Sequence, residues 1–424
     1  MKAFIYRFIL AFAFITQSYA VEPSLFNPAA MIDPVGFTVA IKNVGQGSCT
    51  IIRNHENNHF LVIDAGSLSD KPRNTEARLS EEFGFSEVNG DIPLSKDSVT
   101  VVVSHSDKDH INLFKSVFGP NQLLLGNIGR IYLGDHFENY FRVPETREFL
   151  TGFVKRVPGI EGRLTSLSHD LMGLSVSDHL SDVAYTLDRG KYHPFRTHVR
   201  GEGFLTARQI AIPQNVFEII GANAGAKADG DASETDTNIN SAVVRLSIAG
   251  SNILVMGDAT GATTDRILSD ISNPAFLKAE LLVASHHGAD TEDTNHITWA
   301  AVTEPKHVAL SSGFNKGYKH PTLTAVAHYL VTGLESDRVY SSPLWGIEFL
   351  QRDMHELSVF NGIGRHIATL KPHIVGLEWV KLDETHEGWV IARTVKPIYA
   401  TGSSGELRYT FSDQGKLVHF WRER

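Results

Sequence analysis

The stretch VVVSHSDKDHIN, from Val101 to Asn112, places four side chains that can bind a metal directly after an apolar, β-branched run. They are His105, Asp107, Asp109 and His110. The run before them is typical of a buried central strand, and the residues after them change to a helical period. Imidazole nitrogens and carboxylate oxygens suit Zn²⁺, and a carboxylate-rich set also admits Mn²⁺ or Fe²⁺. Two interpretations are open here: a polar turn that starts a helix, or half of a two-metal hydrolytic site.

The second half of the chain repeats this pattern. Asp258 follows the strand-like run NILVMGD, the pair His286 and His287 follows ELLVAS, and His320 comes after a third run, directly before Pro321. Each has an ordinary explanation alone, because an Asp after a strand often caps a helix and a His pair is often on the surface. The recurrence of His or Asp at strand ends favours a metal site, in which one carboxylate could bridge two cations.

Composition limits the class of protein. The chain has 424 residues, 42% of them hydrophobic and 21% charged, with a formal net charge of −9. An acidic protein does not bind nucleic acid through bulk electrostatics, so an anionic substrate needs a local basic patch or bound cations. The single cysteine, Cys49, excludes an intramolecular disulfide.

The first twenty residues have the plan of a secretory signal peptide. Lys2 and Arg7 precede or flank a short apolar stretch, and Ser18-Tyr19-Ala20 forms a small-x-small cleavage site. We therefore expect an exported protein, periplasmic or secreted, without stable membrane anchoring after cleavage; an uncleaved anchor is the alternative. Residues 21–349 are predicted to form the main domain.

Strands alternate with helical stretches in two halves of the main domain, which predicts a layered α/β fold. An antiparallel meander is expected near its start and a hairpin at SAVVRLSI and NILVMGD. Residues 135–235, which are less regular, are predicted to be an insertion between the halves. The alternating runs of residues 350–424 predict a β-rich C-terminal extension.

Seven stretches resemble, in order, the metallo-β-lactamase fold, and specifically the soluble hydrolase module of ComEC-type DNA-uptake proteins. The matching stretches are NVGQGSCTII at Asn43–Ile52, FLVIDAG at Phe60–Gly66, VSHSDKDHI at Val103–Ile111, NSAVVRL at Asn240–Leu246, ILVMGD at Ile253–Asp258, ASHHGAD at Ala284–Asp290 and SGFNKGYKHP at Ser312–Pro321. The resemblance implies an αβ/βα sandwich with a two-metal cleft at one edge.

The resemblance also implies a ligand set for two divalent metal ions, with zinc first and manganese or iron as alternatives. His105 and Asp107 would bind the first metal, and Asp258 would bridge both. The second metal would be held by Asp109, His110 and His286. Asp109 would also orient the nucleophile, a metal-bound hydroxide.

Other positions take supporting roles in the resemblance. Asp64 would brace the metal loop, His320 would line the cleft and contact substrate or leaving group, and His287 could replace its neighbour as ligand. Asn240 replaces a histidine that relatives use at the first metal, which leaves that site poor in ligands. Asn43 and Ser48 also depart from the family pattern, where Asp is usual.

The substrate is predicted from a basic segment of the insertion. The stretch DRGKYHPFRTHVR, at Asp188–Arg200, interleaves Arg189, Arg196 and Arg200 with aromatic residues, as in surfaces that bind single-stranded nucleic acid. A solvated loop with internal salt bridges is the alternative. We expect an exported metal-dependent hydrolase acting on a small-molecule or nucleic-acid phosphodiester, with no protein partner evident. A hydrolase of another ester, a lactone or an amide, or a binding protein with a decayed metal site, are the alternatives.

Overall fold

A computed structural model gives the fold. The structure describes residues 35–68, 98–118, 127–135, 137–156, 164–166, 199–200, 204–205, 208–212, 215–221, 237–271, 273–313, 315, 317–318, 320–332, 345–350, 357–360, 366–370, 377–380, 389–394 and 397–422. The chain divides into two compact units, Met1–Pro34 and Val35–Arg424, and every described residue belongs to the second. The expected signal peptide and two of the arginines predicted to bind substrate, Arg189 and Arg196, lie outside the described residues. Arg200 lies in strand β7 (Val199–Arg200), but its side chain is not described.

The first large sheet contains the predicted meander. Its eight strands have the order β22-β21-β1-β2-β3-β4-β5-β6. Their bounds are β1 (Val35–Ile41), β2 (Thr50–Asn54), β3 (His59–Ile63), β4 (Val99–Val103), β5 (Ile128–Leu133), β6 (Leu164–Ser166), β21 (Leu407–Ser412) and β22 (Leu417–Arg422). β1, β2 and β3 pair antiparallel, which confirms the meander, whereas β3, β4, β5 and β6 pair parallel. The carboxyl ends of β3 and β4 therefore lie at the same edge.

The second large sheet contains the predicted hairpin. Its seven strands have the order β20-β14-β13-β12-β11-β10-β9. Their bounds are β9 (Arg208–Ile212), β10 (Asn215–Gly221), β11 (Val243–Ile248), β12 (Ser251–Val255), β13 (Leu281–Val283), β14 (His307–Leu310) and β20 (Ile398–Ala400). β11 and β12 pair antiparallel, as predicted, while β12, β13, β14 and β20 pair parallel. The loops after β12, β13 and β14 consequently leave the sheet at one edge.

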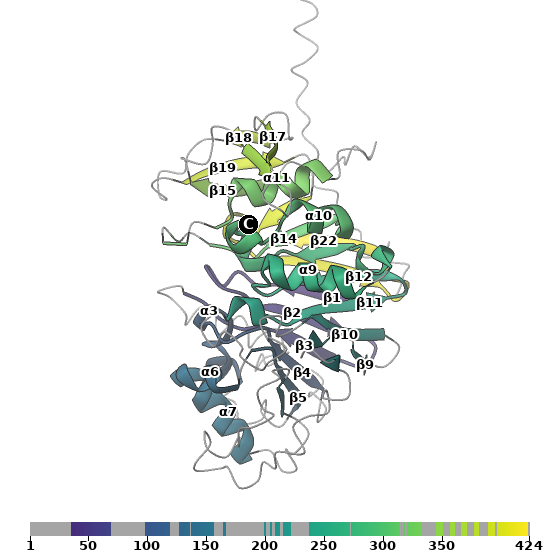
Figure 1. Ribbon diagram of the computed structural model, residues 1–424. Coiled ribbons are helices and arrows are strands. Elements are labelled where there is room, and N and C mark those ends of the chain that lie inside the picture. Colours follow the sequence, from purple (N-terminus) through teal and green to yellow (C-terminus); the bar gives the residue numbers. More distant parts are fainter. Residues whose placement is uncertain are drawn as a thin grey trace, which may run out of the picture. The chain divides into compact units, whose positions relative to one another are not determined.

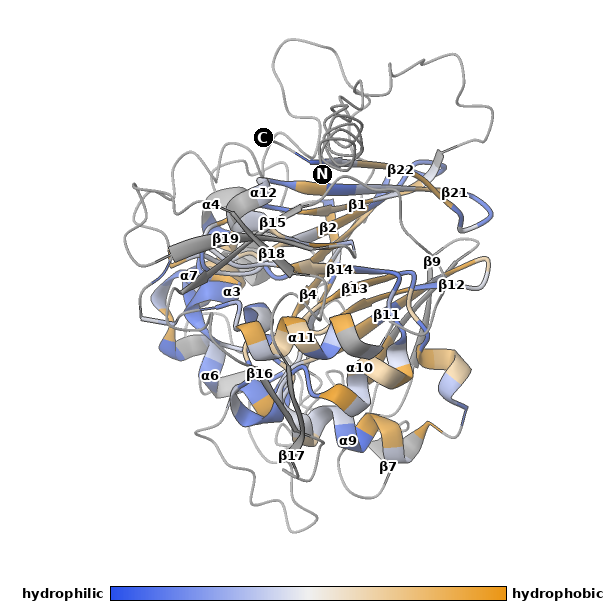
Figure 2. Cartoon of the chain, turned by 90° about the horizontal axis from the view of Figure 1, so that it is seen from above, coloured by the Kyte–Doolittle hydropathy of each residue, from blue (hydrophilic) through white to orange (hydrophobic). Residues whose placement is uncertain are grey.

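The main core lies between the two sheets, which Figure 2 shows as two orange layers of strands. Alternate residues of each strand face this core, among them Val39 and Ile41 from β1, Leu246 from β11 and Leu281 from β13, all at most 1% exposed. Each such aliphatic side chain stabilises the fold by roughly 1.5–3 kcal/mol relative to exposure. Two-residue periodicity in both sheets therefore fixes which face of each sheet is internal.

Helices cover the outer faces of both sheets (Figure 1). On the second sheet, α9 (Gly261–Asp270), α10 (Ile297–Thr303) and α11 (Leu323–Thr332) form a second core with the outward residues of the strands, including Trp299 and Leu254. Beside the first sheet lie α4 (Phe114–Phe118), α6 (Phe137–Arg142) and α7 (Pro144–Arg156). Here the Tyr140 hydroxyl donates a hydrogen bond to the Val103 carbonyl of β4, 3.3 Å away. These layers form the predicted αβ/βα sandwich. Within the described ranges, no helix is both long and apolar enough to cross a membrane.

The C-terminal segment contributes to both large sheets. β20 pairs with β14, and β21 pairs with β1 in a register that joins Val39 to Tyr409. Between α11 and β20, the described residues are strands of smaller sheets. These strands are β15 (Trp345–Leu350), β16 (Leu357–Phe360), β17 (His366–Leu370), β18 (Leu377–Val380) and β19 (Trp389–Thr394). Residues 398–422 of the segment expected as an extension are thus an integral part of the sandwich.

Candidate metal centre

The opening stretch forms the loop after β4 and the short helix α3 (Lys108–Ile111). Asp107 stands at the N-cap of α3, but its side chain makes no capping hydrogen bond. Its carboxylate accepts a hydrogen bond from Thr237 Oγ1 at 2.7 Å and lies 3.7 Å from His105 Nε2. Burial raises the pKa of Asp107, but the proximity and charge of the His105 ring outweigh burial and lower this pKa to about 2. The polar turn therefore presents its carboxylate to the site.

Two of the resembling stretches hold the backbone of α3 from behind. The backbone N–H of Ser48 donates to the Asp109 carbonyl at 2.9 Å, and that of Ala65 donates to the His110 carbonyl at 2.8 Å. Gly66 passes so close that a Cβ on it would lie 2.2 Å from the carbonyl carbon of Asp109. Glycine is required there because any side chain would collide with the backbone of the metal loop. These contacts fix the height of Asp109 and His110 above the sheet.

Asp64, at the end of β3, fixes the orientation of His110. Its carboxylate accepts hydrogen bonds from the backbone N–H and the hydroxyl of Ser104, both at 2.7 Å, and from His110 Nδ1 at 2.8 Å. A carboxylate only accepts, so Nδ1 of His110 carries a proton and Nε2 faces the site. Burial lowers the pKa of His110, but the charges of Asp258 and Asp64 outweigh burial and hold this pKa well above its usual value. The contact with Asp64 is one that metal-bound histidines commonly make.

Asp258 lies at the centre of the cluster, in the turn after β12. One of its oxygens lies 3.1 Å from His110 Nε2. The other lies 3.8 Å from His105 Nε2, 3.7 Å from His286 Nε2 and 3.6 Å from His287 Nε2. Burial raises the pKa of Asp258, but the charges of His110, His287 and His286 hold this pKa well below its usual value. A carboxylate that faces four imidazole nitrogens is placed as a shared ligand.

The histidine pair lies in the turn after β13. His286 and His287 have φ angles of 48° and 56°, and Gly288 follows with 85°. The left-handed conformation costs a non-glycine residue about 1–2 kcal/mol, so the surrounding contacts must sustain it. Nδ1 of His287 lies 2.7 Å from the Ser311 carbonyl, which only accepts, so Nδ1 carries a proton and Nε2 of the same ring faces the site.

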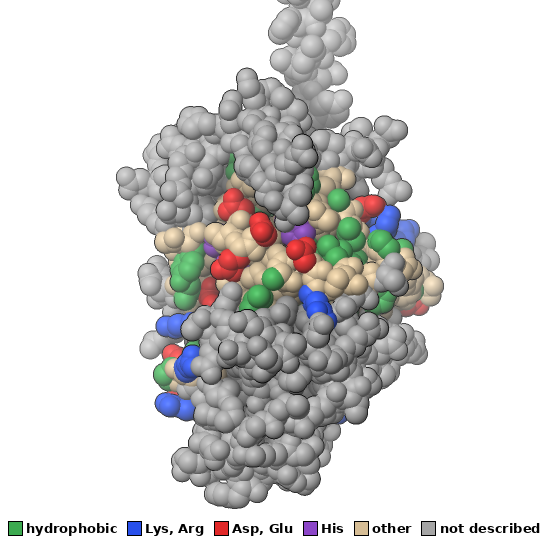
Figure 3. All heavy atoms as spheres, in the orientation of Figure 1, with side chains coloured by type: hydrophobic (Ala, Val, Ile, Leu, Met, Phe, Trp, Pro, Cys, Tyr) green, Lys and Arg blue, Asp and Glu red, His purple; other side chains and the backbone are tan. Residues whose placement is uncertain are grey.

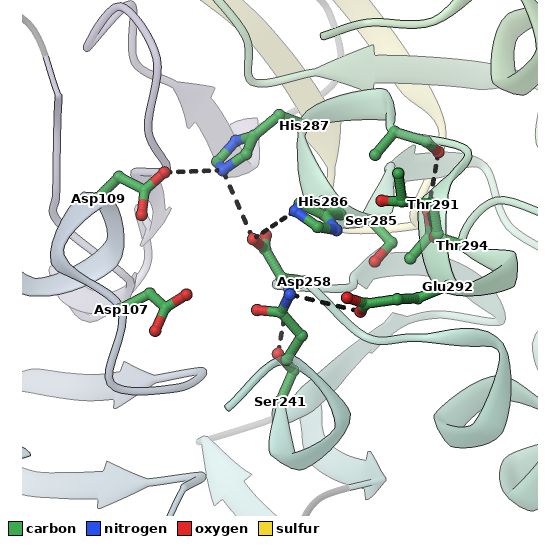
Figure 4. A network of polar contacts seen from close by, with 12 residues as sticks. Asp107, Asp109, Ser241, Asp258, Ser285, His286, His287, Thr291, Glu292 and Thr294 are labelled. Atoms are coloured by element: carbon green, nitrogen blue, oxygen red, sulfur yellow. Dashed lines mark hydrogen bonds and ion pairs between the residues drawn. The ribbon is translucent and has the colours of Figure 1, made fainter. Parts of the chain in front are cut away.

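The structure distinguishes the two neighbouring histidines, which spacing could not. His287 Nε2 lies 3.3 Å from Asp109 Oδ2 and 3.6 Å from Asp258 Oδ2, so this ring stands between the two carboxylates (Figure 4). His286 approaches Asp258 from the other side and is 15% exposed. Both histidines reach the cluster, and His287 is the one nearest Asp109 of the opposite sheet.

Ligand atoms from these residues form two overlapping groups. One contains His105, His110 and Asp258, and the other contains Asp109, His110 and His287, with the atoms of each group within 4.8 Å of one another. His105 Nε2 is buried and has no hydrogen-bond partner among the described residues. A buried imidazole nitrogen without a partner is unfavourable unless a ligand occupies it. The donor set therefore fits divalent cations of the zinc type.

His320 lies at the rim of the cluster. Its ring centroid is 5.2 Å from that of His286 and 6.4 Å from that of His287. Burial, followed by the charges of His287 and His286, lowers the pKa of His320 to about 3. The side chain is thus neutral at neutral pH and lies against the histidine pair. Figure 3 shows Asp, Glu and His side chains gathered on one face of the molecule.

Asn240 lies beside the first of these groups and is oriented by Asp135, a buried residue that the sequence analysis did not select. The Asn240 amide donates to Asp135 Oδ1 at 3.0 Å, and the Ser106 hydroxyl donates to Asp135 Oδ2. Asn139 adds a third hydrogen bond to the same carboxylate at 3.1 Å. Asp135 follows β5 just as Asp258 follows β12, so extending the strand-end rule to β5 would have found it.

Comparisons with known proteins were made by sequence and by structure. No family model matches the chain. Over 87 residues the chain is 29% identical to the competence protein ComA of Neisseria gonorrhoeae; the match covers 20% of this chain and 12% of that protein, so the chain spans a small part of its length. Among solved structures, the metallo-β-lactamase fold protein YhfI of Bacillus subtilis is 11% identical with a TM-score of 0.32, and covers 64% of this chain and 85% of its own. The short form of human tRNase Z is 10% identical with a TM-score of 0.30, and covers 64% of this chain and 91% of its own.

The sandwich topology and the His/Asp cluster at its edge define the class of protein: an αβ/βα sandwich with a candidate metal centre, which resembles the metallo-β-lactamase fold. Within that class, the sequence resembles the ComEC-type proteins, as the order of its motifs predicted and as the match to ComA supports.

Proposed function

We propose that this protein is a metal-dependent hydrolase that binds two divalent cations, with zinc first and manganese or iron as alternatives. One observation carries the proposal: Nε2 of His110 and Nε2 of His287 lie 3.3 Å apart. Their Nδ1 atoms are committed as donors to Asp64 and to the Ser311 carbonyl, so both Nε2 atoms face each other and the carboxylates of Asp258 and Asp109. Burial lowers the pKa of both rings, but these carboxylates and Asp64 outweigh burial and raise it, and a cation that replaces the Nε2 protons would satisfy the same acidic groups.

The geometry supports a specific division of ligands. We assign Asp109, His110 and His287 to one cation, with Asp258 shared, because their ligand atoms form one compact group. The other cation takes His105, Asp107 and Asp258. His286, which approaches the free side of Asp258, is placed to supply the ligand that Asn240 does not provide. The sequence analysis assigned His286 to the second cation, with His287 as its alternative. Here His287 takes that place and His286 is assigned to the first cation.

The chemistry follows from charge and orientation. When bound, two cations act as a Lewis-acid pair that activates water and offsets the negative charge of a substrate. Asp258 and Asp109 hold the cluster together, and Asp64 keeps the proton of His110 on Nδ1. His320 is neutral and placed to donate a ring N–H to a substrate or leaving-group oxygen rather than a proton. Because metal-activated water is the nucleophile, this scheme requires no serine nucleophile.

A phosphodiester is the substrate class we propose. The support is the resemblance to ComEC-type DNA-uptake proteins and the basic segment at residues 188–200 of the sequence. The clustered carboxylates would repel a phosphate on their own, so substrate entry requires the cations to reverse the local charge. An exported location remains the prediction from the first twenty residues, which the described part of the chain does not include.

The proposal is tested by metal analysis of the purified protein together with a substrate panel. We expect up to two transition-metal ions per chain and a melting temperature that falls on chelation, because a ligand that binds the native state stabilises it. Hydrolysis of a bis-aryl phosphodiester should be lost with chelator and restored by Zn²⁺ or Mn²⁺. A protein that holds no metal under replete conditions and melts identically with chelator disproves the metal site. A metal-loaded protein that ignores phosphodiesters but opens a lactone or β-lactam disproves the substrate class alone.

A further inference from the structure

The side-chain amide of Asn295 bonds to both ends of the loop that carries His286 and His287. The Asn295 side chain accepts a hydrogen bond from the backbone N–H of Ser285 at 3.1 Å. It donates to the Ser285 carbonyl at 2.8 Å and to the Ala289 carbonyl at 2.8 Å. Ser285 and Ala289 are the residues on either side of the three left-handed positions, so Asn295 joins the two ends of the loop.

The orientation of this amide is determined by its partners. Oδ1 of Asn295 faces the Ser285 N–H and also accepts from the Tyr329 hydroxyl at 2.7 Å. Nδ2 faces two carbonyls, which accept only. A rotated amide would place donors against donors and acceptors against acceptors, and so the observed orientation is the one that satisfies every partner. Tyr329, on α11, thereby connects the loop to the helical layer.

Asn295 is itself held in place. It is 1% exposed and has a φ angle of 52°, and its carbonyl lies 2.9 Å from His328 Nδ1. The neighbouring Thr294 hydroxyl adds a further hydrogen bond to the Ala289 carbonyl at 2.9 Å. A buried, fully bonded side chain is a rigid support, in contrast to a surface side chain that could follow the movements of the loop.

We propose that Asn295 is a positioning residue that holds His286 and His287 in their left-handed conformation, with Tyr329 as its own support. The role assigned to the held histidines rests on the proposed metal-dependent function. Left-handed histidines tend to relax toward ordinary backbone angles, and relaxation of this turn would rotate both rings away from Asp258. Asn295 therefore sets the metal affinity of the site without contacting the metal or the substrate.

A matched control is available in the second sheet, outside the histidine loop. Nδ2 of Asn252, in β12, also donates to two carbonyls, those of Phe276 at 3.2 Å and Lys278 at 2.8 Å. Asn252 therefore holds the segment at residues 276–278, which is not the histidine loop. We compare Asn295→Ala with Asn252→Ala. For the support, Tyr329→Phe is compared with Tyr409→Phe, because the buried Tyr409 hydroxyl has no hydrogen-bond partner among the described residues.

The experiment measures Zn²⁺ affinity by calorimetry, kcat and KM for a bis-aryl phosphodiester, and amide hydrogen exchange over residues 285–289. Asn295→Ala should weaken Zn²⁺ binding by about 10- to 100-fold, as loss of supporting contacts to metal ligands does elsewhere, and lower kcat more than it raises KM. Tyr329→Phe should weaken binding by a few fold. Asn295→Asp keeps the acceptor but sets a carboxylate oxygen against two carbonyls, and should not rescue. Asn252→Ala and Tyr409→Phe should bind Zn²⁺ as the wild type does.

The outcomes are separable. If Asn295→Ala loses no more Zn²⁺ affinity than Asn252→Ala, the positioning role is wrong. If the wild type binds no metal, the proposed function fails, and amide hydrogen exchange then tests the positioning role by itself. Faster exchange at residues 285–289 in Asn295→Ala than in Asn252→Ala supports that role. Equal exchange in the two variants overturns it. Should Asn295→Ala not fold, the comparison of Tyr329→Phe with Tyr409→Phe decides in the same way.

Discussion

His110 and His287 are 177 positions apart in the sequence, yet their Nε2 atoms lie 3.3 Å from each other. One ring comes from the loop after β4 of the first sheet and the other from the loop after β13 of the second. Each ring is oriented by a hydrogen bond at its far nitrogen, to Asp64 and to the Ser311 carbonyl. The contact therefore joins the two halves of the sandwich at the proposed metal site.

Asp258→Asn should remove most of the metal and the hydrolysis while the fold persists. The substitution keeps the shape of the side chain but deletes the charge that faces four imidazole nitrogens. We expect a loss of at least about 100-fold in kcat/KM. Asp265→Asn is the control, because Asp265 lies on α9 with a side chain that is 66% exposed. Metal content and kcat/KM measured on both variants check the prediction; wild-type values for Asp258→Asn would remove this residue from the site.

Asp64→Asn should weaken metal binding without touching a ligand. The Asp64 carboxylate accepts every one of its hydrogen bonds from Ser104 and His110. The NH2 group of an amide in its place would face one of these donors and could not accept from it. We expect Zn²⁺ affinity to fall by about 10- to 100-fold and unfolding free energy to fall by about 1–3 kcal/mol. Calorimetric titration and urea denaturation measure the two effects. Asp290→Asn, on the exposed side of the histidine loop, should change neither; unchanged affinity in Asp64→Asn would contradict the tautomer argument.

The basic segment should distinguish a polymer from a small substrate. Replacing Arg196 and Arg200 by Ala is expected to raise KM for single-stranded DNA far more than for a bis-aryl phosphodiester, because a small molecule does not extend beyond the metals. DNA cleavage by the wild type should also weaken as salt increases, since exposed charges are screened. Steady-state kinetics at several salt concentrations test both statements. Equal effects on the two substrates would assign the arginines to a solvated loop.

His307 predicts a component of acid instability that is independent of the metal centre. Burial, and then the charge of Lys306, lowers the pKa of His307 to about 4 in the folded protein. The unfolded chain retains the ordinary value of about 6.5, so it binds a proton first as pH falls, and stability is lost between pH 6.5 and 4. From pH 7 to pH 5 the loss should be about 2 kcal/mol.

The measurement is urea denaturation of chelated protein at pH 7 and pH 5, compared with His307→Phe. The phenyl ring can retain the contacts with Tyr399 and Tyr409, whose ring centroids lie 6.4 Å and 5.6 Å from that of His307. The variant should lose less stability on acidification than the wild type. Identical losses would show that His307 does not titrate in this way.

Much of the fold could be predicted because local pattern and burial agree. The meander and the hairpin before Asp258 are short apolar runs separated by turn residues, and the central strand before His105 is a continuous apolar run that is buried throughout. The last strands could not be placed so well. An alternating run specifies a strand but not its partner, and it is the pairing of β21 with β1 and of β20 with β14 that brings residues 398–422 into the sandwich.

The sequence by itself determined the chemical type of the site. His and Asp directly after apolar strands indicate which side chains converge, because parallel strands release their loops at one edge, and the family resemblance predicts Asp258 as the shared carboxylate. Only the tertiary structure decided which residues contact one another around the site. It places His287 next to Asp109, Asp135 next to Asn240, and Asn295 against the histidine loop. These facts depend on backbone angles and on hydrogen bonds between residues distant in sequence, and neither is encoded in the spacing of residue types.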